Sequence, residues 1–170
     1  MKWLGAILIL SACTWAGFAF ARRLSDRPRQ LRMLVSALQS FEAEMMYGLT
    51  PLMEASLKLS RQIPKPISYM FAQFAYYLQK GEESAEKAWD ACLADTWPLT
   101  ALQQNELEVM KQFGATLGQH DRIQQQKQIR LALSHLAREE QDAKESQKRF
   151  ESMAKSLGFL TGMLVIVLMI

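Results

Sequence analysis

Both ends of this chain are apolar, and basic residues lie just inside each end. Residues 3–21 carry no charge and are followed directly by Arg22 and Arg23. Residues 157–170 are also uncharged and are preceded by Lys155. Between these stretches lies a polar segment that is long enough for one ordinary domain and too short for two. The sequence therefore predicts an N-terminal transmembrane anchor (1–24), a soluble domain (25–152) and a C-terminal transmembrane anchor (153–170).

The first apolar stretch has the length of a membrane-spanning helix. Its roughly 19 residues would cover about 28 Å, close to the ~30 Å hydrocarbon core of a bilayer. The alternative is a cleaved signal peptide, because Lys2, the apolar run and the Ala-Phe-Ala sequence at 19–21 imitate its three regions. Two arginines directly after the cleavage point would be unusual. We therefore favour an uncleaved anchor.

The second apolar stretch is shorter, at about 14 residues or roughly 21 Å of helix, below the usual requirement for spanning. It could instead dock as a terminal helix on the soluble domain. We favour insertion, because the stretch is apolar on all sides and Lys155 can reach the interface. Small residues are spaced four apart in both anchors, a pattern that allows close packing of membrane helices. These candidate packing residues are Gly158, Gly162, Ala12 and Ala16.

The basic residues predict which side of the membrane carries the soluble domain. On the terminal sides of the two apolar stretches the only basic residue is Lys2, whereas many basic residues lie on the sides that face the central segment. This asymmetry places the soluble domain in the cytoplasm. The net charge of +3 is modest, and attraction to anionic lipid explains it without nucleic acid. The inner basic residues are Arg22, Arg23, Arg27, Arg29, Arg32, Lys144, Lys148, Arg149 and Lys155.

The central segment is predicted to be an all-α, six-helix antiparallel bundle. It shows no sustained strand-like alternation, and helix start and stop signals recur at short intervals. We expect helices over about 25–47, 50–63, 66–80, 84–97, 100–118 and from 121 onward, with a capping box at Thr100–Gln103 opening the fifth. The last helix has no Pro or Gly before Leu157. Its polar stretch 138–149 is either a solvated face or a stalk or paired coil.

No motif for catalysis, phosphate binding or metal binding is present in the sequence. Cys13 and Cys92 fall in different predicted compartments, and His120 and His135 have no evident relay partner. The acidic pairs at 82–83 and 139–140 are expected at helix ends and on solvated faces. We therefore predict a protein that is not an enzyme and that needs no cofactor or metal.

Two regions are candidate contacts for a protein partner. The first is basic and contains Arg27, Arg29 and Arg32. The second is the turn before the last helix, with Gly114, Gly118, Asp121 and Gln125. For the two glycines, a helix C-cap and a close approach of two helices are the simpler explanation.

Several short motifs, in order and spacing, resemble the stage III sporulation protein AB family of endospore-forming bacteria. The likeness covers essentially the whole chain, including both apolar ends. The motifs are RPRQLR at 27–32, LQSFEAE at 38–44, YG at 47–48, TPL at 50–52, FGATLGQHDRIQQ at 113–125 and SLGFL at 156–160.

The resemblance implies a membrane protein of the mother cell, in the outer forespore membrane, and a subunit of the channel or secretion-like complex that links mother cell and forespore. The soluble domain is expected to be similar to the cytoplasmic domains of type II secretion F platform proteins. By that analogy its partner is a cytoplasmic secretion-type ATPase, stage III sporulation protein AA, together with the other channel subunits. The alternative is a structural scaffold that forms homo-oligomers without contacting an ATPase. A third alternative is a catalytic or ligand-binding membrane domain whose site is assembled from scattered residues.

Overall fold

The computed structural model of the chain describes residues 25–48, 50–81, 84–118 and 122–169. These residues form six α-helices and no strand, which confirms the predicted all-α fold. The first helix covers residues 25–46 in the described part of the chain. The others are α2 (Leu52–Gln62), α3 (Ile67–Lys80), α4 (Ala85–Thr96), the short 3-10 helix η1 (Trp97–Leu99), α5 (Gln104–Gly114) and α6 (Arg122–Met169).

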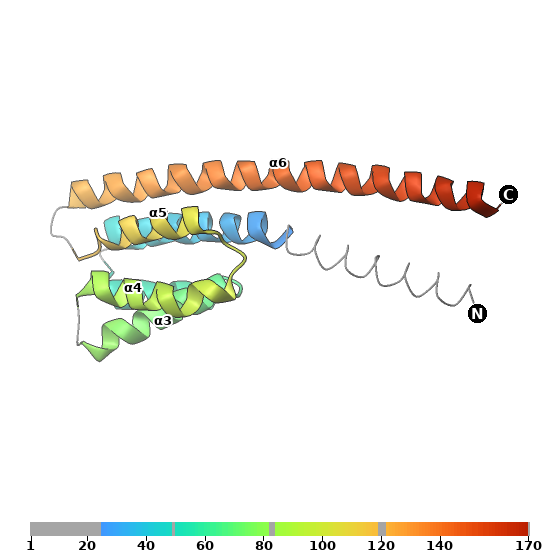
Figure 1. The fold of residues 1–170 in the computed structure, drawn as a ribbon. Coiled ribbons are helices and arrows are strands. Elements are labelled where there is room, and N and C mark those ends of the chain that lie inside the picture. The colour runs from blue at the N-terminus through green and yellow to red at the C-terminus, as the bar shows by residue number, and fades with distance from the viewer. Residues whose placement is uncertain (1–24, 49, 82–83, 119–121, 170) are drawn as a thin grey trace.

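The helices lie antiparallel to their chain neighbours, with α6 along one side, α3 and α4 on the far side, and the first helix and α5 between them (Figure 1). The first helix and α6 run in opposite directions, because Gln147 donates a hydrogen bond to Ser25 at one end and Gln126 donates one to Glu42 at the other. We call the end with Ser25, η1 and Gln147 the base of the bundle, and the opposite end its tip.

The first helix supplies one side of the core. Leu31, Leu34, Leu38 and Phe41 are fully buried, and Met45 packs against them, as their three- and four-residue spacing predicts. Burying each such side chain contributes about 1.5–3 kcal/mol. This stripe therefore holds the first helix to the bundle along most of its length.

An aromatic cluster around Trp89 forms the centre of the core. The Trp89 ring lies 4.8 Å from that of Phe74, 5.4 Å from that of Phe113 and 6.0 Å from that of Phe71, measured between centroids. Its indole N–H donates to the carbonyl oxygen of Met110 at 2.8 Å. Residues from α3, α4 and α5 thus meet at one buried ring, and the hydrogen bond fixes its orientation.

The helix boundaries mostly follow the proline, glycine and serine signals of the sequence. Pro51 is the N-cap of α2 and Pro66 that of α3. Gly81 ends α3 with φ +68°, a conformation that side chains disfavour. Ser84 caps α4, because its hydroxyl accepts the backbone N–H of Lys87 at 3.4 Å.

The predicted capping box at the start of the fifth helix was wrong by three residues. After α4 the chain makes the η1 turn, and the Thr100 hydroxyl donates to the carbonyl oxygen of Trp97 at 2.7 Å. Helix α5 begins only at Gln104, and there the Glu106 carboxylate accepts the backbone N–H of Gln103 at 2.8 Å. The η1 turn uses the hydroxyl that the prediction assigned to the cap.

Helix α6 is one continuous helix of 48 residues, and no Pro or Gly interrupts its part before Leu157, as predicted. Its polar stretch 138–149 does not stand alone: Ala143 is buried, and Gln147 donates to Ser25 at 3.3 Å. This stretch therefore packs on the first helix of the same chain through the side with Ala143, while most of its other residues are exposed. A paired coil with a second copy stays a prediction.

In the part of the chain that the structure describes, no helix is both long enough and apolar enough to cross a membrane. The predicted first anchor, with Ala12 and Ala16, lies outside the described residues. The surroundings of Gly158 and Gly162 lie outside them as well.

Candidate functional site

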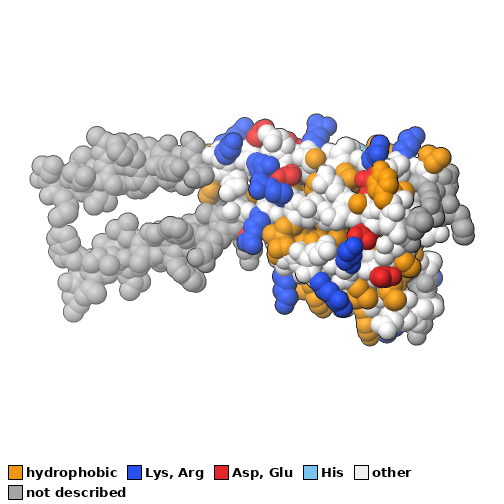
Figure 2. Space-filling view, turned by 180° about the vertical axis from the view of Figure 1, so that it is seen from behind, with side chains coloured by type: hydrophobic (Ala, Val, Ile, Leu, Met, Phe, Trp, Pro, Cys, Tyr) orange, Lys and Arg blue, Asp and Glu red, His pale blue; other side chains and the backbone are white. Residues whose placement is uncertain are grey.

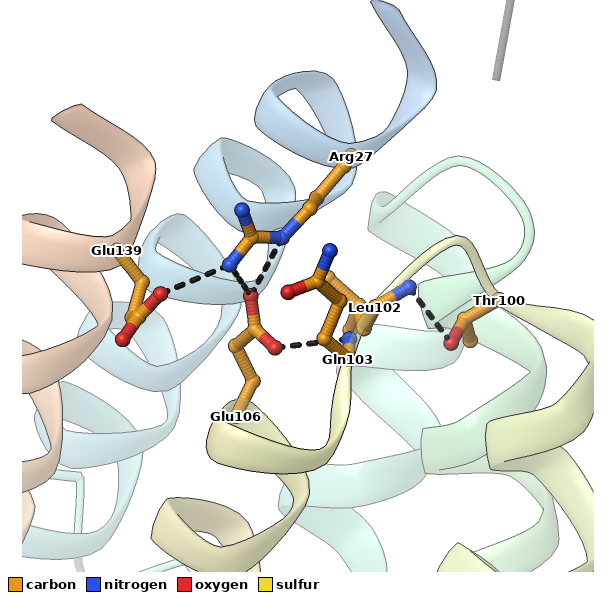
Figure 3. A network of polar contacts seen from close by, with 6 residues as sticks. All are labelled: Arg27, Thr100, Leu102, Gln103, Glu106 and Glu139. Carbon is orange, nitrogen blue, oxygen red and sulfur yellow. Dashed lines mark hydrogen bonds and ion pairs between the residues drawn. The ribbon is translucent and has the colours of Figure 1, made fainter. Parts of the chain in front are cut away.

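A cluster of three charged side chains joins three helices near the base of the bundle (Figure 3). Arg27 of the first helix donates from Nε and Nη2 to Oε1 of Glu106 on α5, at 2.9 and 2.6 Å. The same Nη2 donates to Oε2 of Glu139 on α6 at 2.8 Å. We call these three residues the Arg27 cluster. It places α5 and α6 in fixed contact with the first helix.

The cluster is largely withdrawn from water. The Glu106 side chain has no exposed surface, that of Arg27 is 16% exposed and that of Glu139 is 25% exposed. The second oxygen of Glu106 accepts the Gln103 N–H at the start of α5, where the helix dipole favours a negative charge. Both oxygens of this buried carboxylate are thus satisfied, as burial of a charge requires.

Sequence reasoning did not identify Glu106. The available signal was a Glu three residues after Gln103, but Gln is not among the usual N-cap residues and an acidic first turn normally faces solvent. Its burial depends on Arg27, which lies 79 positions away in the chain.

A second ion-pair group joins the same two helices beside the Arg27 cluster. Glu140 of α6 accepts Arg32 Nε at 3.0 Å and Lys144 Nζ at 2.6 Å, and its side chain is only 12% exposed. The expectation that residues 139–140 form a solvated acidic face was therefore wrong, because both carboxylates turn toward arginines of the first helix. Burial raises the pKa of Glu140, but the hydrogen bonds from Lys144 and Arg32 outweigh it and leave that pKa below its ordinary value of 4.5.

This depressed pKa predicts a pH dependence of stability. Glu140 stabilises the fold above about pH 4.5, and that contribution disappears as the pH falls through the lower pKa of the folded state. Glu140→Gln should lower stability at neutral pH and make the decline below pH 4.5 shallower. Urea unfolding midpoints between pH 3 and 7 measure both effects. The exposed Glu145→Gln is the control, and parallel pH profiles of wild type and Glu140→Gln would refute this role.

The predicted basic contact patch divides into residues with different surroundings. Arg27 points inward and belongs to the Arg27 cluster, whereas Arg29 is exposed. Arg32 is 67% exposed and contacts Glu140. Arg29 and the outer part of Arg32 can therefore meet a partner, while Arg27 holds the fold together.

The predicted turn region also divides. Gly114 is buried against Trp89: a Cβ on Gly114 would lie 2.2 Å from the Trp89 Cδ1 atom. Gly118 is exposed with φ +83°, and Gln125 is 5% exposed. Asp121 lies outside the described residues. Gly114 thus serves the close approach of α4 and α5, and Gly118 the turn that follows.

One exposed surface was missed by sequence reasoning. On α6, near the tip, a shallow recess of about 350 Å³ lies between side chains of one face of the helix. We call this face the α6 outer face. Ile123 is 83% exposed and Leu131 is 45% exposed. The upper edge of Figure 2, where α6 runs, shows basic side chains along the helix and hydrophobic ones toward the tip. The α6 outer face consists of Ile123, Gln126, Lys127, Arg130 and Leu131.

A larger hollow of about 780 Å³ lies at the base, between the first helix, the η1–α5 connection and α6. Asp26, Leu99 and Phe150 are among its lining residues, so polar and apolar groups are mixed there.

The thiol of Cys92 is buried, and burial raises its pKa to about 12. A thiol with that pKa is not a nucleophile at neutral pH.

Comparison with known proteins gives consistent matches over the length of the chain. The family described as Stage III sporulation protein AB matches residues 2–170. The chain is 51% identical to the stage III sporulation protein AB of Bacillus subtilis (strain 168), over 169 residues and 99% of both chains. A solved structure of stage III sporulation protein AB, also 51% identical, superposes with a TM-score of 0.71 and covers 73% of this chain and 98% of that chain.

Proposed function

Because this chain belongs to the stage III sporulation protein AB family, we propose that it is a non-enzymatic membrane platform of the mother cell–forespore channel complex. A role in sporulation follows from family membership. The proposal adds that the helical bundle receives a cytoplasmic secretion-type ATPase and passes its conformational changes to subunits in the membrane.

The observation that carries this proposal is the position of the Arg27 cluster. Its three side chains connect α5 to the first helix and to α6, the two helices that lead toward the apolar ends of the chain. A displacement of the bundle must therefore move both of these helices together. Packed interiors transmit such displacements because they do not deform continuously.

The apolar ends themselves complete the platform. We propose that residues 1–24 and 153–170 insert in the membrane and that the soluble domain lies on the cytoplasmic side. The basic residues just inside the apolar ends favour this side, because such residues stay in the cytoplasm. Both ends leave the bundle at its base, since Ser25 and Gln147 lie together there. The tip then faces away from the membrane, where a soluble ATPase can reach it.

A substitution that weakens the coupling without removing the partner tests the proposal. Glu139→Gln removes the α6 charge of the Arg27 cluster and leaves the Arg27–Glu106 pair intact. We expect the full-length variant to retain the ATPase in pull-downs from sporulating cells but to give fewer spores than the wild-type chain. Glu145→Gln, on the exposed side of the same helix, is the matched control.

The outcomes separate the platform from the scaffold alternative. Normal spore counts with Glu139→Gln would contradict coupling through the cluster. Failure of the wild-type chain to capture the ATPase, with cross-linked copies of the chain still present, would favour the scaffold.

A further inference from the structure

The first turns of α6 have two contrasting faces. Gln125, Ile129 and Leu136 are buried against the bundle. At about 100° per residue, Ile123 and Lys127 lie on the opposite side of the helix. The α6 outer face therefore turns away from the protein's own core.

The apolar residues of the α6 outer face are placed as in a helix-docking surface. Ile123 and Leu131 are separated by eight residues, with Lys127 between them, and the recess of about 350 Å³ lies among them. Single exposed apolar residues are ordinary on protein surfaces. Two large ones at i and i+8 beside one recess lie on the same face of the helix, as the anchors of docking amphipathic helices do.

The charge of this surface specifies its complement. Lys127 is exposed, and the Arg130 side chain is 67% exposed although its Nε contacts Glu42 at 3.4 Å. Both cations therefore extend toward solvent on either side of the recess. A partner with carboxylates flanking an apolar stripe would pair with them and cover Ile123 and Leu131 at the same time.

A second copy of this chain does not fit the same surface. Copies inserted in one membrane stand parallel, so two-fold pairing along α6 would place Lys127 and Arg130 opposite their own equivalents. Like charges at such short range repel. Glu42 offsets part of the Arg130 charge, but no carboxylate is among the residues that line the recess beside Lys127. The α6 outer face is therefore not complementary to itself, and its charge favours a different protein as the partner.

We propose that the α6 outer face binds an acidic amphipathic helix of a partner protein. This inference rests on the proposed platform function and deepens it, because it assigns the docking surface and the chemistry of the segment that docks. The partner helix lies along the first three turns of α6, with its apolar side over Ile123 and Leu131 and its carboxylates beside Lys127 and Arg130.

Site-specific photo-cross-linking in sporulating cells tests the proposal on the full-length chain. A photoreactive residue replaces Leu131 in one strain and Tyr69 of α3 in another; the two positions have similar exposures, 45% and 42%. At position 131 we expect a cross-linked peptide that is net negative, with apolar residues at helical spacing. Lys127→Glu/Arg130→Glu should lower its yield about tenfold or more, because attraction becomes repulsion. Arg138→Glu/Lys148→Glu, with the same charge change on exposed positions of α6, should not.

Each other outcome contradicts the inference: a neutral or basic peptide, a peptide from a second copy of the chain, equal yields in the two charge variants, or no cross-link from position 131. ATPase capture is scored separately in the same cells. Capture without the position-131 cross-link overturns the docking surface and leaves the platform standing. A cross-linked acidic peptide without ATPase capture supports the docking surface and overturns the platform.

Discussion

Replacement of Arg27 by methionine is expected to lower the free energy of unfolding by about 3–5 kcal/mol, the usual cost of removing one partner from a buried ion pair. The reason is the position of Glu106, whose side chain has no exposed surface and whose Oε1 accepts two of the three hydrogen bonds that Arg27 donates. Glu139 is 25% exposed and can be hydrated. The uncompensated carboxylate on α5 therefore carries most of the loss.

A double-mutant cycle separates this effect from lost packing. Glu106→Gln keeps an acceptor for the Gln103 N–H and removes the charge, so Arg27→Met/Glu106→Gln should recover a substantial part of the stability. Arg29→Met, at an exposed position two residues away, is the control. Chemical unfolding of the full chain in detergent, followed by circular dichroism, gives the free energies. A loss below about 1 kcal/mol for Arg27→Met, typical of a surface pair, would contradict this account.

Gly114→Ala is expected to destabilise the protein by about 1–3 kcal/mol, the usual cost of overpacking a core. Helix propensity alone predicts a gain of about 0.5–1 kcal/mol for the same change inside a helix. The sign reverses because the added Cβ would lie 2.2 Å from the Trp89 Cδ1 atom, and the Trp89 ring is held by its hydrogen bond to Met110.

Relief of the clash provides the test of this explanation. In a Trp89→Leu background the smaller side chain leaves room, so adding Gly114→Ala should cost much less than it does in the wild type. Thermal and urea unfolding of the four full-length proteins measure the difference. If Gly114→Ala stabilises the protein, or if its effect is the same in both backgrounds, the close approach of α4 and α5 does not explain this glycine.

The helices were predictable because their signals are local. The spacing of Leu31, Leu34, Leu38 and Phe41 identifies one buried face, and Pro51, Pro66 and Gly81 mark breaks that depend on their own backbone preferences. The misplaced cap of α5 shows the limit of such signals. Thr100 resembles an N-cap, but the η1 turn before it takes its hydroxyl.

The candidate site was less predictable because it depends on tertiary contacts. Arg27 was identified as a basic residue near the membrane, and only its distance to Glu106 shows that it is a buried structural partner. The α6 outer face has the same composition as many solvated helix faces. Ile123 and Leu131 become informative only once Ile129 and Leu136 are known to occupy the buried side.

Purification of the full-length chain from membranes of sporulating cells, with mass spectrometry of the proteins that accompany it, tests the central claim most directly. The platform account predicts that a secretion-type ATPase is recovered with the wild-type chain, together with membrane subunits of the channel complex. Recovery of the chain from the membrane with further copies of itself, but without an ATPase in repeated preparations, would contradict the account.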